Sequence, residues 1–315
     1  MSIPLSSSHP AATATERDGV SWRDLAGAYY NLTKPRIMLL LLITTLAALL
    51  IAARQHPLPL DDFVRVLLMT LLGGALSSGG AAALNCYIDR DIDAVMNRTK
   101  RRALPSGVLR PRQVLIYGLS LSALAVVVLV LWVNPLAAAL SLLGNVYYVV
   151  IYTMWLKRST SQNIVIGGAA GAIPPLVGWA AVTGSVGAPA LLLFAIIFLW
   201  TPAHFWALAL INRKDYAAVK VPMLPAVAGE QYTKWRILAY TLTVVAVTLL
   251  LYAIHAMGLL YLVAACALGG GFIYMAVMLL REQGVRRARR TFMYSNIYLA
   301  LLFVAMVADR IVPLR

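Results

Sequence analysis

The chain has 315 residues, of which 61% are hydrophobic and only 12% are charged, and its formal net charge is +15. Its mean hydropathy is +0.78. Soluble domains are usually about 45–50% apolar and about 25% charged, so this composition excludes an ordinary soluble protein and predicts a polytopic membrane protein. The positive charge does not indicate a nucleic-acid partner, because the basic residues lie in short connectors between apolar runs. The two cysteines form neither a disulfide framework nor a zinc pattern.

The chain before the first apolar run is predicted to be a leader. It begins with a polar stretch rich in Ser, Ala and Thr, and this stretch lacks the apolar core of a signal peptide. We therefore expect residues 1–30 to form a disordered cytoplasmic segment. Residues 31–315 are then expected to form a single transmembrane domain.

Nine apolar runs are long enough, or nearly so, to cross a bilayer of about 30 Å as helices. The predicted fold is therefore all-α, a polytopic membrane bundle of about nine transmembrane helices. The expected spans are 37–53, 64–85, 114–133, 136–155, 163–183, 189–211, 236–255, 258–280 and 292–309.

The distribution of Lys and Arg predicts the orientation of this bundle. With the N-terminus in the cytoplasm, the inside connectors are long, polar and basic. Only four basic residues then fall outside, and they are Arg54, Arg65, Arg310 and Arg315. Since cytoplasmic loops carry an excess of Lys and Arg, we expect an N-inside, C-outside topology with the functional site at the cytoplasmic face.

One polar stretch, residues 85–107, contrasts with the apolar chain around it. It starts at the end of the second predicted helix, and Asn85, Asp89 and Asp93 follow at intervals of four, which places them on one helix face. Asp91 points away from that face and is expected to be a boundary charge. Carboxylates at this spacing, with basic residues just beyond them, are suited to hold a divalent cation against a phosphate. The plain alternative is a charged loop between two helices. The basic residues of the stretch that we single out are Arg98, Lys100, Arg101 and Arg102.

A second polar segment echoes the first. The sixth predicted helix ends in Asn212, followed by Asp215 and Tyr216, and a basic loop with prolines comes next. A tandem four-helix repeat plus one extra helix would bring the two segments face to face across a central cavity. We state this as a hypothesis.

Three further segments allow both a structural and a functional interpretation. Arg36, just after the helix-starting Pro35, is either a cytoplasmic anchor or a contact to an anionic substrate. Tyr152 is either an interfacial anchor or part of a substrate wall. The Gly- and Pro-rich residues 167–175 are predicted to let helices approach closely and to break or kink the fifth helix.

Polar side chains near the ends of the fourth and sixth predicted helices are candidates for ligand contacts. Lys157 and Arg158 open a short loop that includes Asn163, and basic residues beside neutral donors suit a phosphate, although the positive-inside rule explains the charges too. His204 lies eight residues before Asn212, which is roughly 12 Å deeper along a helix. An intramembrane histidine favours a functional role.

Several uncommon blocks occur in order along the chain. Together they resemble the UbiA-type intramembrane prenyltransferase superfamily, and within it the branch that farnesylates haem, over about residues 30–300. The blocks are Thr33–Arg36, Asn85–Asp93, Arg98–Arg102, Leu104–Gly107, Tyr152–Thr160, Gln162–Gly168, Gly171–Trp179, His204–Ala209, Asp215–Tyr216 and Val221–Pro225.

The resemblance implies a reaction and its cofactor. A farnesyl group would pass from farnesyl diphosphate to the 2-vinyl group of haem B, with addition of water, giving haem O and diphosphate. Mg²⁺ would be the cofactor, held by Asp89 and Asp93 with the amide oxygen of Asn85, and haem would be a substrate rather than a prosthetic group. Lys157 and Arg158 would complete the catalytic set.

The resemblance also implies substrate contacts, a location and partners. His204 is the candidate axial ligand of haem. Arg98 and Arg102, together with Lys157 and Arg158, would neutralise the negative charge of the diphosphate. We expect a multi-pass protein of a bacterial-type inner membrane, in contact with the lipid bilayer, whose active site faces the cytoplasm. Its product could be handed to a haem A synthase. The other expected substrate contacts are Arg36, Tyr152, Asn163, Asn212, Asp215 and Tyr216.

Two other functions compete with this interpretation. In the wider superfamily the second motif usually carries a pair of aspartates four apart, whereas here those places hold Asn212 and Tyr216, with Asp215 between them. A prenyltransferase that acts on an aromatic acid in quinone synthesis would normally keep that pair. A secondary transporter would place its carboxylates deep within helices, but here they cluster at the membrane boundary.

Overall fold

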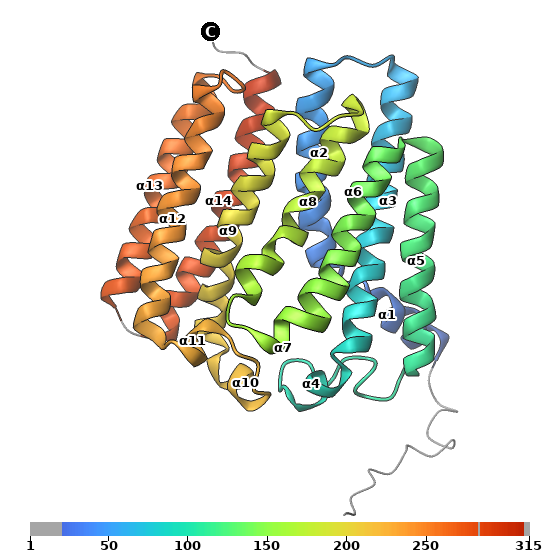
Figure 1. The fold of residues 1–315 in the computed structure, drawn as a ribbon, viewed down its shortest axis with the longest axis vertical. Helices are drawn as coiled ribbons and strands as arrows, with labels where there is room; N and C mark the ends of the chain where they lie inside the picture. The colour runs from blue at the N-terminus through green and yellow to red at the C-terminus, as the bar shows by residue number, and fades with distance from the viewer. Residues whose placement is uncertain (1–20, 283, 312–315) are drawn as a thin grey trace, which may run out of the picture.

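Long helices dominate the structure, a computed structural model that describes residues 21–282 and 284–311. Within these ranges, nine helical segments are long and apolar enough to cross a membrane, and they stand side by side as an upright bundle (Figure 1). The nine spans are α2 (Pro35–Gln55), α3 (Leu60–Ile88), α5 (Pro111–Trp132), a composite of α6 (Pro135–Val146), η2 (Tyr147–Leu156) and α7 (Lys157–Ser159), α8 (Asn163–Thr183), α9 (Ala188–Ile211), α12 (Glu230–Ala253), α13 (Leu259–Arg281) and α14 (Val285–Ile311).

The short helices gather at one end of the bundle. Figure 1 shows α4, α7, α10 and α11 together at the end opposite to the one where α14 ends. The prediction of an all-α bundle with nine transmembrane helices is confirmed, and the described part of the chain contains no strand. The polar segments of the sequence therefore share one end. The short helices are α1 (Trp22–Leu32), α4 (Arg90–Val95), α10 (Arg213–Ala218) and α11 (Leu224–Val227).

Part of the predicted leader is helical. Of the expected disordered segment, residues 1–30, residues 1–20 lie outside the described part of the chain, whereas Trp22–Leu32 form α1. This helix buries Ala28 and Leu32, which are four residues apart and therefore lie on the same face. Two buried residues in an otherwise polar segment are a weak sequence signal for a helix, so α1 was not predicted from the composition.

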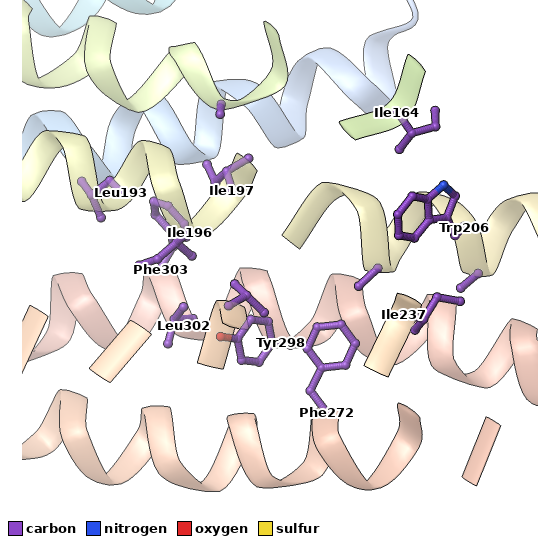
Figure 2. Close-up of a cluster of buried hydrophobic side chains, with 14 of the residues drawn as sticks. Ile164, Leu193, Ile196, Ile197, Trp206, Ile237, Phe272, Tyr298, Leu302 and Phe303 are labelled. Carbon is purple, nitrogen blue, oxygen red and sulfur yellow. The ribbon is translucent and has the colours of Figure 1, made fainter. Parts of the chain in front are cut away.

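The main hydrophobic core surrounds α9. Ile196 of α9 and Phe303 of α14 face one another within this cluster (Figure 2). Phe272 of α13 lies against Tyr298 of α14, with ring centroids 5.0 Å apart, and the Tyr298 hydroxyl is 2.7 Å from Oγ1 of Thr248. Because lipid tails are as apolar as these side chains, close packing and such internal hydrogen bonds stabilise the bundle.

A glycine brings α8 directly against α2. A Cβ atom on Gly178 would lie 2.1 Å from the carbonyl oxygen of Thr45, so only a glycine permits this approach. Pro174 and Pro175 both lie inside α8, which nevertheless runs unbroken from Asn163 to Thr183. The proline pair therefore does not break the fifth transmembrane helix.

We expect Gly178→Ala to destabilise the protein by about 1–3 kcal/mol, because the new methyl group would force the backbones of α2 and α8 apart. Thermal unfolding in detergent measures this loss. Gly171→Ala is the matched control in the same helix, since nothing lies within 4 Å of its added Cβ. Equal melting temperatures for the two variants would contradict the close approach.

Candidate active site

Asn85, Asp89 and Asp93 form a buried polar row at the end of α3. The helix ends at Ile88, and the chain turns at Asp89 into α4. Backbone hydrogen bonds from Asp89 N–H to the Asn85 carbonyl, 2.9 Å, and from Asp93 N–H to the Asp89 carbonyl, 2.8 Å, keep the helical register through this turn. All three side chains are buried, so the predicted shared face exists.

Asp89 is the centre of this row and is only 1% exposed. Its Oδ2 atom accepts hydrogen bonds from the Lys157 ammonium and from Asn85 Nδ2, the latter at 2.7 Å. Its Oδ1 atom lies 3.8 Å from Arg158 Nη2 and has no hydrogen-bond partner among the described residues. A buried carboxylate oxygen without a donor is suited to bind a cation.

Asp93 is bound by the loop that follows α4. Arg102 Nη1 donates to Asp93 Oδ2 at 2.7 Å, and the Thr99 hydroxyl donates to the Asp93 carbonyl at 3.0 Å. These two bonds fold the basic loop back over the acidic row. Arg102 and Asp93, which are nine positions apart in the sequence, are thus in direct contact.

Asp91 has a different environment from the other two aspartates. Its side chain is 59% exposed, and it forms two hydrogen bonds with the Arg158 guanidinium, at 2.6 and 2.7 Å. This pairing lowers the pKa of Asp91 to about 2. The pair therefore persists at neutral pH and would be lost only as the pH falls towards 2. Asp91 lies at the surface of the site, as the helical spacing predicts.

A π-helix brings the fourth span to the acidic row. In η2 the backbone follows an i to i+5 pattern, and Lys157 N–H binds the Tyr152 carbonyl. The fully buried Thr153 donates to the Tyr148 carbonyl at 2.8 Å and accepts from Asn85 Nδ2 at 3.1 Å. Sequence reasoning missed Thr153, because an apolar run gives no signal for this wide turn.

Tyr152 and Asn163 lie beside this contact, on η2 and α8. The Tyr152 ring stacks on Tyr148 with centroids 5.5 Å apart, and Gly167 leaves room for it, since a Cβ there would lie 2.3 Å from Tyr152 Cδ2. Asn163 Nδ2 donates to the Lys157 carbonyl at 3.4 Å. Its Oδ1 atom is buried without a hydrogen-bond partner among the described residues. Asn163 therefore has an acceptor left for a ligand.

Lys34 reaches the row from the start of α2. Its ammonium donates to Asn85 Oδ1 at 2.6 Å, and its φ angle of 50° lies in the left-handed region. Such a backbone is uncommon outside glycine and is retained where surrounding contacts require it. The sequence singled out Arg36 instead, and that side chain is exposed on the first turn of α2. The substrate contact of Arg36 stays a prediction.

A second polar segment meets the first at the same end of the bundle. Arg98 Nη2 donates to the hydroxyl of the buried Tyr216 at 3.0 Å, and its guanidinium lies 5.1 Å from the centroid of the Tyr216 ring. This contact supports the hypothesis that the two segments face one another. Asn212 donates to the Leu208 carbonyl at 3.1 Å, and Asp215 is half-buried beside a cavity of about 280 Å³.

His204 is enclosed by aromatic rings of α9 and α14. Its ring centroid lies 4.2 Å from that of Trp200 and 4.6 Å from that of Phe292. Its Nδ1 atom is 2.8 Å from the Ser295 hydroxyl. The hydrogen bond orients the ring through one nitrogen, which leaves Nε2 as the atom that could bind a metal or a substrate.

The metal-ligating side chains of this site fit one Mg²⁺ ion that also binds substrate phosphate and water. They do not fit a metal site whose ligands all come from the protein. Among the described residues, no group of three or more His, Cys, Asp or Glu side chains could hold a metal. Mg²⁺ is usually bound by one or two carboxylates together with substrate phosphate and water, and Asp89 and Asp93 meet that requirement. The amide oxygen of Asn85, a predicted ligand, accepts from Lys34, so it would have to exchange partners to reach a metal.

Comparison with known families shows which family this chain belongs to. The UbiA prenyltransferase family matches residues 41–302. The chain belongs to this family. The predicted resemblance to UbiA-type prenyltransferases is therefore confirmed, and the chain is a multi-pass membrane prenyltransferase.

Curated relatives give the match more detail. The chain is 55% identical over 284 residues to a protein of Gloeobacter violaceus named protoheme IX farnesyltransferase, and the match covers 90% of this chain and 92% of the relative. It is 51% identical over 305 residues to a protein of the same name from Chloroflexus aurantiacus, covering 97% of this chain. The chain spans about half, 51%, of the length of that second relative.

Solved structures share the fold. A digeranylgeranylglyceryl phosphate synthase superposes with a TM-score of 0.74 at 18% identity and covers 91% of this chain and 98% of its own. A UbiA homologue from Archaeoglobus fulgidus, bound to DMAPP and Mg²⁺, superposes with a TM-score of 0.59 at 13% identity and covers 88% of this chain and 98% of its own. At these identities the likeness concerns the fold alone.

We expect Thr153→Val to destabilise the protein by about 1–3 kcal/mol, because valine keeps the shape of threonine but leaves one Asn85 donor proton and the Tyr148 carbonyl without their partner. Thermal unfolding in detergent measures the change. Thr153→Ser keeps the hydroxyl and should lose less. If the valine variant is as stable as the serine variant, the hydrogen bonds do not support the site.

Proposed function

We propose that the chain transfers a farnesyl group from farnesyl diphosphate to the 2-vinyl group of haem B, with addition of water, and releases haem O and diphosphate. The observation that carries this proposal is the acidic row at the end of α3, which meets cations from separate segments of the chain. The names of the curated relatives support haem and a farnesyl donor as the substrates.

Asp89 and Asp93 are the residues that would hold Mg²⁺. When bound, the ion would neutralise negative charge on the diphosphate and so make it a better leaving group. The Oδ1 atom of Asp89, which has no hydrogen-bond partner among the described residues, supports this assignment. A dimethylallyl diphosphate and Mg²⁺ are bound in the homologue from Archaeoglobus fulgidus.

The basic residues of the site would bind the diphosphate. Lys157, Arg158 and Arg102 pair with carboxylates of the site, and Lys34 binds the Asn85 amide. These contacts hold the cations within reach of an incoming anion. Charge-assisted hydrogen bonds from them to phosphate oxygens would favour departure of the leaving group.

The chemistry itself would break the allylic C–O bond and the π bond of the vinyl group, and it would form one C–C bond and one C–O bond from water. Diphosphate leaves with the bonding electron pair, and the allylic farnesyl cation is attacked by the π electrons of the haem vinyl group. Water then adds to the carbon beside the porphyrin ring and loses a proton, which gives a hydroxyethylfarnesyl group. The faces of Tyr148 and Tyr152 would stabilise the cation.

Haem would lie between the two polar segments. Tyr216 and Asp215 are part of the second segment, which contacts the first through Arg98. His204 lies deeper, on α9, the helix that precedes this segment. His204 Nε2 is our candidate axial ligand, since Nδ1 is engaged by Ser295.

We place this site at the cytoplasmic face of a bacterial-type inner membrane. The excess of Lys and Arg in the connectors at the motif end supports this orientation. Residues 31–315 would act as one transmembrane domain. Delivery of the product to a haem A synthase stays a prediction.

One experiment separates the proposed reaction from prenylation of an aromatic acid. Membranes that contain the overproduced chain are supplied with farnesyl diphosphate and Mg²⁺ and with either haem B or hydroxybenzoate. Haem O in the pigment extract supports the proposal. A prenylated acid without haem O would favour the quinone-pathway alternative, and uptake into proteoliposomes without either product would favour a transporter.

We expect Asp89→Asn and Asp93→Asn each to lower Mg²⁺-dependent farnesyl transfer about hundredfold or more while the protein stays folded in the membrane, because each removes a carboxylate from the metal site. Asp91→Asn is the comparison, since this exposed residue lies outside the row, and its loss should be far smaller. Wild-type activity in both of the first two variants would overturn the metal assignment.

We expect His204→Ala to alter the absorption spectrum of haem bound to the purified protein, because an axial nitrogen ligand would be lost. Absorption spectroscopy of the haem-loaded protein at equal haem content is the measurement. His255→Ala, exposed at the other end of the bundle, is the control. An unchanged spectrum with haem still bound rules out the axial role.

A further inference from the structure

A second cavity lies at the end of the bundle opposite to the acidic row. Its volume is about 390 Å³, within the range of about 300–1,000 Å³ typical of ligand pockets. It is formed where α2 ends, where the chain crosses to α3, and where α14 ends (Figure 1). The lining residues are Leu50, Ile51, Ala53, Arg54, Pro57, Leu58, Phe63, Val307 and Arg310.

Two arginines from helices far apart in sequence line this one cavity. Arg54 belongs to the last turn of α2 and Arg310 to the last turn of α14. The ion pairs among the described residues include neither of them. Arg310 Nε is buried and has no hydrogen-bond partner in the described part of the chain. A guanidinium is always charged in proteins, so a buried unpaired N–H favours binding of an anion.

Two of the acidic residues at this end of the bundle are engaged elsewhere, and Asp61, exposed in the first turn of α3, is not among the lining residues. Asp309, beside Arg310, accepts from the backbone N–H groups of Gly258, at 2.6 Å, and Tyr261, at 3.1 Å, and so caps the start of α13. Asp62 at the start of α3 pairs with Arg65 at 2.7 Å. No carboxylate is among the residues that line the cavity. Its charge is therefore positive.

The remaining wall is apolar and lies at the boundary of the membrane. Leu50, Leu58, Phe63 and Val307 are half-buried there. A ligand that satisfies both parts carries a phosphate for the two guanidinium groups and a hydrocarbon portion for the wall. Arginine binds phosphate oxygens in a bidentate geometry, and an anionic phospholipid presents its phosphate at this depth.

We propose that this cavity binds the headgroup of an anionic phospholipid from the leaflet opposite to the acidic row. The proposal explains why two arginines lie on the side of the bundle that the positive-inside rule otherwise leaves poor in basic residues. It is independent of farnesyl transfer, because none of its residues belongs to the candidate active site.

Native mass spectrometry of the purified full chain tests the proposal. The protein is exchanged into equal amounts of phosphatidylglycerol and phosphatidylcholine, and the ratio of the retained lipids is measured. We expect wild type to retain phosphatidylglycerol preferentially. Arg54→Gln combined with Arg310→Gln should lower that ratio about tenfold, and each single variant about threefold.

Arg65→Gln is the matched control, since it removes the same charge at the same end from a residue already paired with Asp62. The wild-type ratio is expected for this variant. The proposal is overturned if either single variant keeps the wild-type ratio, or if Arg65→Gln lowers it as much. It is also overturned if soluble glycerol phosphate displaces the lipid completely, because the ligand is then a free anion. The single variants keep the test valid if the double variant does not fold.

Discussion

The pairing of Asp89 with Lys157 is the contact on which the polar end of this protein depends. Asp89 is almost completely buried at a membrane boundary, where an unpaired carboxylate would be very costly. Its partners come from its own helix and from the end of the fourth span. The charge therefore requires α3 and the end of η2 to stay together.

The other charged contacts extend this constraint in two directions. Arg102 and Asp93 fold the basic loop over the row, and Arg98 and Tyr216 join that loop to the segment after α9. The hydrophobic bundle behind them holds its helices at fixed spacings, as the approach of α8 to α2 at Gly178 requires. Rigid helices thus carry side chains whose partners are polar and exchangeable, an arrangement suited to the proposed binding and release of an anion.

The sequence predicted those features that follow from local patterns. The nine apolar runs correspond to nine candidate membrane spans in the part of the chain that the structure describes, because membrane spans need only length and hydrophobicity. The buried row follows from a spacing of four. Lys34 and Thr153 were missed, because their roles depend on a left-handed backbone and on a π-helix that tertiary contacts select. Helix α1 was missed because its buried stripe is short. The partners of each carboxylate could not be predicted either, since several basic residues lie near the motif.

The π-helix has a consequence for the lengths that the chain can tolerate. α6 continues without a break through η2 to Lys157. The number of residues in this stretch therefore sets both the position of Lys157 along the helix axis and the direction in which its side chain points. Removing one residue from α6, the α-helical part, would turn every later side chain by about 100° and shift it by about 1.5 Å along the axis. Lys157 would then leave Asp89, whereas the exposed loops between other helices have no such register to lose. Insertions and deletions should therefore be excluded from residues 135–157 across proteins that share this site, even where the identities of the lipid-facing side chains drift freely.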